Sequence, residues 1–153
     1  MNTSINVIYS GTVSAATEGA VLGIPAIAVS HASHALTSDL RGAAEFAQRI
    51  AAMVLEKGLP KGTLLNVNVP DIPPDQIVGA RITRQGRSWW DDGFETRQDP
   101  VGRNYYWLVG TYVWDDDPTV DDVALRANMI SVTPLHYNLT DEDLYRDMQS
   151  WLP

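Results

Sequence analysis

The sequence predicts an α/β fold, in which helices pack on the faces of a parallel sheet. The run at 24–30 is short and almost wholly apolar, which is typical of a strand covered on both faces. A second strand-like run at 64–69 is closed by Pro70. Each run follows a segment with helical periodicity, and strands that alternate with helices are typical of parallel sheets.

The first helix is expected from about Gly11 to Leu22, where apolar residues recur at helical spacing. Ser10 or Gly11 precedes these residues as a cap, and Gly23 followed by Pro25 is a stop signal. A strand is expected directly before this helix. Ser10 would then stand at a junction between a strand and a helix.

The second helix is expected at roughly 38–57, where a broad apolar face ends at "KGLP". Beyond "PDIPPD" the pattern changes. Residues 79–86 are expected to form a strand, 88–95 a loop, and 104–114 an aromatic, hairpin-like arm.

Strand character returns at 129–134, and a terminal helix follows. Thr140 and Asp143 have the spacing of a capping box, and Leu139 and Leu144 that of a hydrophobic staple. The helix is therefore expected to begin at Thr140.

The length and composition describe one domain. The chain has 153 residues, of which 44% are hydrophobic, so it can bury roughly 70% of the surface that its unfolded form exposes. It contains no internal repeat or linker. We expect a single domain over 1–153, with an α/β core at about 1–85 and a hairpin arm and terminal helix at about 86–153.

Charge and cysteine content exclude several classes of protein. The formal net charge is −8, which argues against a nucleic-acid partner, because such partners need clustered Lys and Arg. Without cysteine, the chain has no disulfide framework, thiolate nucleophile or cysteine metal site. No apolar run approaches membrane-spanning length. The expected location is the cytoplasm.

The tripeptide Ser10-Gly11-Thr12 is the strongest candidate site. The first backbone N–H groups of a helix are unpaired and point outward at the positive end of the helix dipole, which makes an anion site. Gly11 would let a ligand approach the backbone, while the Ser10 and Thr12 hydroxyls could each donate to a phosphate oxygen. The alternative is simple N-capping by Ser10.

Other polar groups have weaker patterns. Asp91, Asp92 and Gly93 form an Asp-Asp-Gly run, but in a late loop where the acids are expected to face solvent. The segment 114–122, "WDDDPTVDD", could bind a hard cation, but it lacks the spacing of a calcium loop and is expected to be a solvated acidic turn. Asp121 is expected to be structural.

The histidines are also candidates. His31 and His34 follow a predicted strand, where α/β proteins often place active-site loops. No carboxylate is close in sequence, so an exposed loop is the preferred interpretation. His136 is expected to pack or to form a hydrogen bond.

The aromatic residues at 105–114 could form a platform for a sugar or a base. The preferred interpretation is that they alternate along a hairpin and are buried against a neighbouring subunit. Arg97 and Arg103 are expected to pair with acids across this arm.

Several blocks together resemble the SurE survival-protein family: "VIYSGTVSAATEGAVLGIPAIAVS", "GTLLNVNVPDIP", "RITRQG", "RQDPVGRNYYWLVG" and "ISVTPLHYNLT". The resemblance runs from about Asn2 to the C-terminus. It implies a Rossmann-like three-layer sandwich and a metal-dependent 5'-nucleotidase, which hydrolyses nucleoside monophosphates. Ser10, Gly11 and Thr12 would lie against the phosphate, with Asn2 near the site.

The resemblance also implies a cofactor and partners. Family members hold a divalent metal, Mg or Mn, with two aspartates of an "NDDG" turn, a serine and the first asparagine of a "GINxGxN" turn. All of these precede the segment that matches this chain, in which Asn2 is the second asparagine of the last turn. We therefore expect no catalytic or metal-binding residue within this chain, an N-terminally truncated fold, and no activity of the chain alone.

Two further expectations concern the chain's surroundings. The arm and the terminal helix would exchange between the subunits of a homodimer or homotetramer. Without the strands that precede it in the family, the strand at 24–30 would be an open edge, so the chain is expected to be oligomeric or poorly soluble. "NTSIN" at 2–6 also loses a glycine relative to the family's "NxGxD" run.

The alternative functions are a non-catalytic remnant that serves as an oligomerisation or binding module and an unrelated anion-binding α/β domain.

Overall fold

The computed structural model describes residues 1–33, 35 and 37–152. Its two apolar runs form neighbouring parallel strands, β1 (Ala26–His31) and β2 (Thr63–Val69), with Ala26 opposite Leu64. The sheet continues through β6 (Met129–His136) to β3 (Gly79–Ile82), in the order β1-β2-β6-β3. The α/β class is therefore confirmed.

The expectation that the sheet is purely parallel is wrong. β6 runs antiparallel to β2, and β3 runs parallel to β6. The reason is the short connection from β2 to β3, which spans 70–78 and holds only the three-residue 3₁₀ helix η2 (Pro74–Gln76). A parallel crossover needs a dozen or more residues, so the chain returns in the opposite direction.

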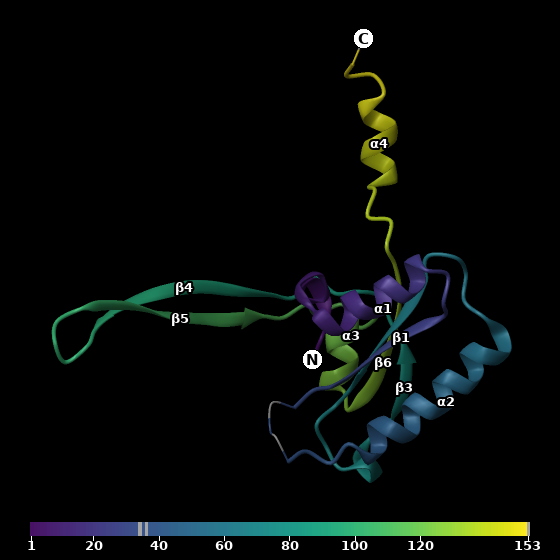
Figure 1. Ribbon diagram of the computed structural model, residues 1–153, viewed down its shortest axis with the longest axis horizontal. Helices are drawn as coiled ribbons and strands as arrows, with labels where there is room; N and C mark the ends of the chain where they lie inside the picture. The colour runs from purple at the N-terminus through teal and green to yellow at the C-terminus, as the bar shows by residue number, and fades with distance from the viewer. Residues whose placement is uncertain (34, 36, 153) are drawn as a thin grey trace.

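The sheet lies between two helical layers (Figure 1). The helix α2 (Arg41–Lys57) covers one face and buries Phe46 and Ile50 against Val67 and Val132. The other face is covered by α1 (Gly11–Val21), the 3₁₀ helix η1 (Ser4–Tyr9) and the short α3 (Asp121–Arg126). This arrangement is a three-layer sandwich, as expected.

The first helix begins at Gly11 as expected, but the segment before it is not a strand. Residues 4–9 form η1, in which the Asn6 amide donates to the Thr3 carbonyl at 3.1 Å. Ser4 opens this helix with φ of 54°, a left-handed conformation that favours glycine. The family glycine that "NTSIN" lacks falls at this residue.

We expect Ser4→Ala to lower the free energy of unfolding by about 1 kcal/mol, because it keeps the left-handed strain and loses one hydroxyl hydrogen bond. That bond runs from the buried Ser4 hydroxyl to Asp121 Oδ1 at 3.3 Å. Ser4→Gly also loses it but relieves the strain, so its cost is expected to be smaller. Urea unfolding of both variants checks the order, and a costlier glycine variant would contradict the strain argument.

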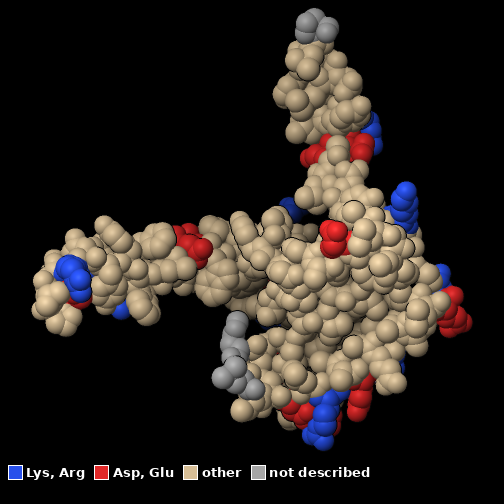
Figure 2. Space-filling view, in the orientation of Figure 1, with Lys and Arg blue, Asp and Glu red and all other residues tan. Residues whose placement is uncertain are grey.

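A long two-stranded arm projects from the sandwich (Figures 1 and 2). β4 (Trp89–Gln98) pairs antiparallel with β5 (Asn104–Val113) along their whole length. The hairpin-like character of 104–114 is confirmed, but the loop expected at 88–95 is wrong. Asp and Gly are poor strand formers, yet a ten-residue ladder with β5 overrides that preference.

The arm's charged residues pair near its tip. Arg103 pairs with Asp99 across the turn at 2.8 Å, as expected, whereas Arg97 pairs with Glu95 two residues before it on the same strand. Asp91 and Asp92 are exposed, as the sequence predicted. The aromatic side chains are also largely exposed: Trp89, Trp90, Phe94, Tyr105, Tyr106, Trp107 and Trp114. Their burial against a second subunit stays a prediction.

The chain ends in α4 (Glu142–Met148), which stands away from the sandwich (Figure 1). Its cap is Asp141 rather than Thr140. The Asp141 carboxylate accepts from the amides of Asp143 and Leu144, whereas the Thr140 hydroxyl donates to Asn138 Oδ1 at 2.7 Å. Asp is as good a cap as Thr, and the competing Asn138 bond decides between them. None of the helices that the structure describes is both long and apolar enough to cross a bilayer.

Candidate functional site

The start of α1 lies at the edge of the sheet where β1 and β2 end. Only residues 22–25 join α1 to β1, so the helix runs back antiparallel along the strand. The eleven residues of α1 span about 16 Å and the six residues of β1 about 20 Å. The start of α1 therefore lies close to the carboxyl end of β1. The carboxyl edge of parallel strands is where α/β proteins bind ligands.

Ser10 caps the helix. Its hydroxyl oxygen accepts from the Val13 amide at 3.1 Å, and its carbonyl accepts from the Ser14 amide at 2.9 Å. The capping alternative is thus confirmed. The cap uses the Ser10 hydroxyl only as an acceptor. Because a serine hydroxyl can accept one hydrogen bond and donate another, its proton is still free to donate.

Gly11 and Thr12 provide an open pair of amides. Both residues are exposed, and within the described chain neither amide has an acceptor. A Cβ placed on Gly11 would meet no atom within 4 Å. The space beside the first helical turn is therefore free for an anion.

Asn2 is held over the strand ends by four hydrogen bonds. Its amide donates to Asn68 Oδ1 at 2.7 Å, and its carbonyl accepts from the Asn66 and Asn68 side chains at 2.7 and 3.0 Å. Its side-chain amide donates to Ser30 Oγ at 2.7 Å. Asn2 thus shares the carboxyl edge with the start of α1, but η1 separates them by about 12 Å along its axis.

Sequence reasoning missed the residues that hold Asn2. Ser30, Asn66 and Asn68 are buried and lie on the α1 side of the sheet. The signal that could have found them is the alternation of Asn in "LLNVNV". Side chains two residues apart on a strand point to the same face, and buried polar side chains need hydrogen-bond partners. The two Asn side chains therefore predict a polar partner on that face of the sheet.

Asp121 joins the start of α3 to two segments that are distant in sequence. Its carboxylate accepts from the backbone amides of Ser4 at 3.0 Å, Gly86 at 3.1 Å and Asp122 at 2.9 Å. Burial raises the pKa of Asp121, and the three amide hydrogen bonds oppose this shift. This carboxylate fixes the turn that follows Asn2, so the structural role expected for it fits these contacts.

The expectation of a solvated acidic turn at 114–122 is wrong in part. Asp116 and Asp117 are exposed, but Asp121 and Asp122 are fully buried. Residues 121–126 form α3, which packs against β6 and buries the carboxylates of Asp121 and Asp122. Asp122 Oδ2 accepts from the Ser88 hydroxyl.

The exposed loop expected at His31 is also wrong. His31 ends β1, its side chain is only 10% exposed, and its Nε2 lies 3.7 Å from Asp71 Oδ1. Asp71 is far away in sequence but follows β2, whose end lies beside that of β1. His34 lies outside the described residues. His136 has the expected hydrogen-bonding role, because its Nδ1 accepts from the Asn138 amide at 2.9 Å.

Comparison with known proteins places this geometry in a family. A family model described as "Survival protein SurE" matches residues 1–92. A relative from Syntrophobacter fumaroxidans named 5'-nucleotidase SurE is 47% identical over 98% of this chain and 60% of its own length. The chain belongs to the SurE family.

Other SurE proteins are also similar to this chain. A 5'-nucleotidase SurE from Geobacter sulfurreducens is 47% identical over 98% of this chain and 58% of its own length. The crystal structure of the SurE protein from Aquifex aeolicus matches with a TM-score of 0.84 and 34% identity, over 99% of this chain and 61% of that one. The Rossmann-like SurE fold is thereby confirmed. The chain spans about 60% of the length of these relatives.

The candidate site does not by itself fit the metal that the SurE resemblance implies. Its polar groups are the hydroxyls and amides of Asn2, Ser10, Thr12, Ser30 and Asn68, whereas Mg²⁺ and Mn²⁺ prefer carboxylate oxygens. Across residues 1–33, 35 and 37–152, no three His, Asp or Glu side chains gather as a metal would require. We therefore derive no chemical step through a metal from these residues.

Proposed function

We propose that this chain forms the phosphate-binding part of a SurE-type 5'-nucleotidase, which hydrolyses nucleoside monophosphates to nucleoside and phosphate. The observation that carries the proposal is the open amide pair of Gly11 and Thr12 at the carboxyl edge of the sheet. The names of the relatives support the reaction class.

Each residue has a role in this proposal. The amides of Gly11 and Thr12 bind the phosphate oxygens, with the helix dipole behind them. The Thr12 and Ser10 hydroxyls donate two further hydrogen bonds. Asn2, held by Ser30 and Asn68, lines the same edge of the sheet.

The reaction itself needs more than this chain holds. A divalent metal, Mg²⁺ or Mn²⁺, would neutralise the phosphoryl oxygens and orient the attacking water. We propose that its carboxylate ligands come from outside the residues described and that the chain alone is inactive. A cytoplasmic location stays a prediction.

We also propose that the SurE chain assembles as a homodimer or homotetramer through its arm and α4. Both elements expose large apolar side chains, among them Trp90, Phe94 and Trp107 on the arm and Leu144 and Trp151 at the C-terminus. The same exposure favours the second candidate function, a non-catalytic oligomerisation module.

Two measurements on the purified chain test the proposal. The first is AMP hydrolysis with Mg²⁺ or Mn²⁺, where we expect no turnover above background; turnover would overturn the proposed inactivity. The second is an NMR titration with AMP, where we expect the amide signals of Gly11 and Thr12 to shift. If no signal moves, the phosphate-binding role is wrong and the oligomerisation module becomes the better candidate.

A further inference from the structure

A cavity of about 240 Å³ lies beside the first turns of α1. Val7 and Ile8 line it from η1, just before the tripeptide at 10–12. Val13 and Ser14 line it from α1, just after the tripeptide. The cavity therefore borders the proposed phosphate site on both sides in sequence.

The cavity extends from this site along α1. Positions 11 and 14 are neighbours on one face of the helix, about 5–6 Å apart. Thr17, which also lines the cavity, lies about 9 Å further along the helix axis than Gly11. Leu64 of β2 and its partner Leu135 of β6 line the far end. A phosphate bound at the amide of Gly11 thus leaves room for a ribose before the cavity is reached.

The cavity has an apolar floor and an open mouth. Val13 and Leu64 belong to the buried core, whereas Ile8 and Leu139 at the rim are exposed. Tyr137 adds an aromatic side chain that is 40% exposed. Pockets for drug-sized ligands occupy about 300–1,000 Å³, so this smaller cavity suits a ring system rather than a whole nucleotide.

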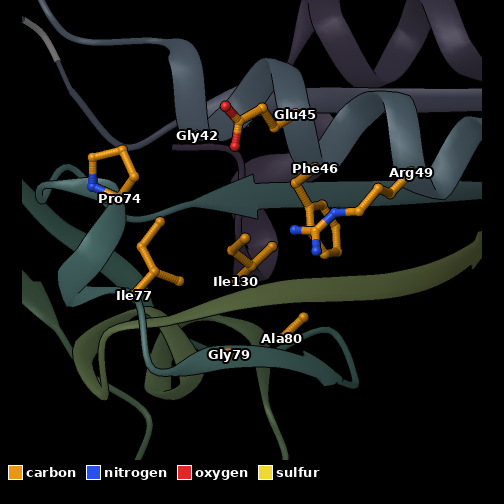
Figure 3. Close-up of a pocket in the computed structure, with 9 residues that line it drawn as sticks. All are labelled: Gly42, Glu45, Phe46, Arg49, Pro74, Ile77, Gly79, Ala80 and Ile130. Carbon is orange, nitrogen blue, oxygen red and sulfur yellow. The ribbon is translucent and has the colours of Figure 1, made fainter.

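The charge of the lining also favours an uncharged ring beside a phosphate. Among the described residues that line the cavity there is no Asp, Glu, Lys or Arg. By contrast, the cavity between β3 and α2 holds Glu45 and Arg49 (Figure 3), the cavity below α1 holds Lys61, and the hollows on the arm hold Asp91 and Asp92.

Gln85 provides a polar group with a defined orientation. Its Nε2 donates to the Ser4 carbonyl at 3.1 Å, which fixes the side-chain amide. Its Oε1 accepts no hydrogen bond from the residues described, and Gln85 lines the cavity. A carboxamide oxygen is an acceptor, so it favours a ligand that carries an N–H donor.

We propose that this cavity holds the base of the nucleoside monophosphate, with the ring over Val13 and Leu64 and an exocyclic amine donating to Gln85 Oε1. The inference rests on the phosphate site proposed above. A side chain of a second copy is a poorer occupant, because it brings no anion to the adjoining amides of Gly11 and Thr12. Adenine has an amine donor at N6, whereas hypoxanthine has a carbonyl there, so AMP should be preferred to IMP.

NMR titrations of the purified chain with inorganic phosphate, AMP and IMP test the inference. All three ligands should shift the amide signals of Gly11 and Thr12, but only the nucleotides should shift those of Leu135 and Tyr137. We expect AMP to bind at least tenfold more tightly than phosphate, and more tightly than IMP. The phosphate titration tests the phosphate site by itself.

Thr17→Phe fills the cavity from α1. It should weaken AMP binding at least tenfold and change phosphate binding less than twofold, because Thr17 lies away from the amides that hold the phosphate. The matched control is Ala80→Phe, which adds the same side chain to the cavity of Figure 3, on the opposite face of the sheet. It should change neither affinity more than twofold.

Three results would overturn the inference while the phosphate site stands: equal affinities for AMP and phosphate, no shift at Leu135 and Tyr137, or equal effects of the two phenylalanine variants. If phosphate does not shift Gly11 and Thr12, both proposals are wrong. If Thr17→Phe does not fold, the three ligands on the unchanged chain decide. Shifts at Leu135 and Tyr137 that grow with protein concentration alone would identify a second copy as the occupant, and would also overturn it.

Discussion

Asp121→Ala is expected to lower the free energy of unfolding by about 3 kcal/mol or more, because each unpaired buried donor costs about 1–3 kcal/mol. The substitution leaves the amides of Ser4, Gly86 and Asp122 without an acceptor, because all three donate to this carboxylate. The variant no longer has to bury a carboxylate, and this gain in stability offsets part of the loss. Urea unfolding followed by circular dichroism measures the result.

The pH dependence of this loss has a definite sign. Burial raises the pKa of Asp121 above its ordinary value of 3.8, so the stability that the side chain contributes is greatest at low pH. It falls as the pH rises through the raised pKa. The destabilisation by Asp121→Ala should therefore be larger at about pH 4 than at about pH 8.

Asp116→Ala is the matched control, because Asp116 is an exposed acid in the preceding loop. Its effect should stay within about 0.5 kcal/mol, as is usual for surface substitutions. If the two variants unfold alike, the three amides do not depend on Asp121, and its role as a link between segments is wrong.

Gly11→Val is expected to weaken AMP binding at least tenfold, which corresponds to about 1.4 kcal/mol. The valine side chain would occupy the open space beside the first turn of α1, where Gly11 now leaves the amides accessible. The fold should tolerate the change, because a Cβ at this position meets no neighbouring atom within 4 Å. NMR titration gives the affinity, and urea unfolding gives the stability.

The control for this variant is Ala15→Val, an exposed position one turn further along the same helix. It should leave AMP affinity unchanged. A tenfold loss in both variants would point to a general change in α1. No loss in Gly11→Val would mean that phosphate does not lie against these amides, and the proposed site would have to move.

Within the residues that the structure describes, β1 pairs with β2 alone and lies at an edge of the sheet, as the sequence predicted. Its predicted consequence, an oligomeric or poorly soluble chain, remains to be measured. Sedimentation of the purified chain checks it: we expect species larger than a monomer or loss by precipitation, whereas a stable monomer would contradict the argument.

The helix α1 and the strand β1 could be predicted because the patterns that specify them lie within a few neighbouring residues. Helical spacing and the stop at Gly23 and Pro25 predicted α1, and an apolar run predicted β1. The candidate anion site followed from Ser10, Gly11 and Thr12, since a helix start leaves its first amides unpaired whatever surrounds it. The error at 88–95 arose because pairing with β5 overrides the local preference of Asp and Gly. The error at the cap of α4 arose because Asn138, two residues before Thr140, takes the hydroxyl of Thr140.

The sequence by itself therefore determined the main helices and strands, the α/β class and the exposed amides of the first helix, because periodicity and capping act within a few residues. Only the tertiary structure decided the mixed direction of the sheet, the burial of Asp121 against Ser4, and the approach of Asp71 to His31. These contacts join residues up to 117 positions apart. Hydrogen bonds and burial between such distant groups depend on how the layers pack, and no local pattern records that packing.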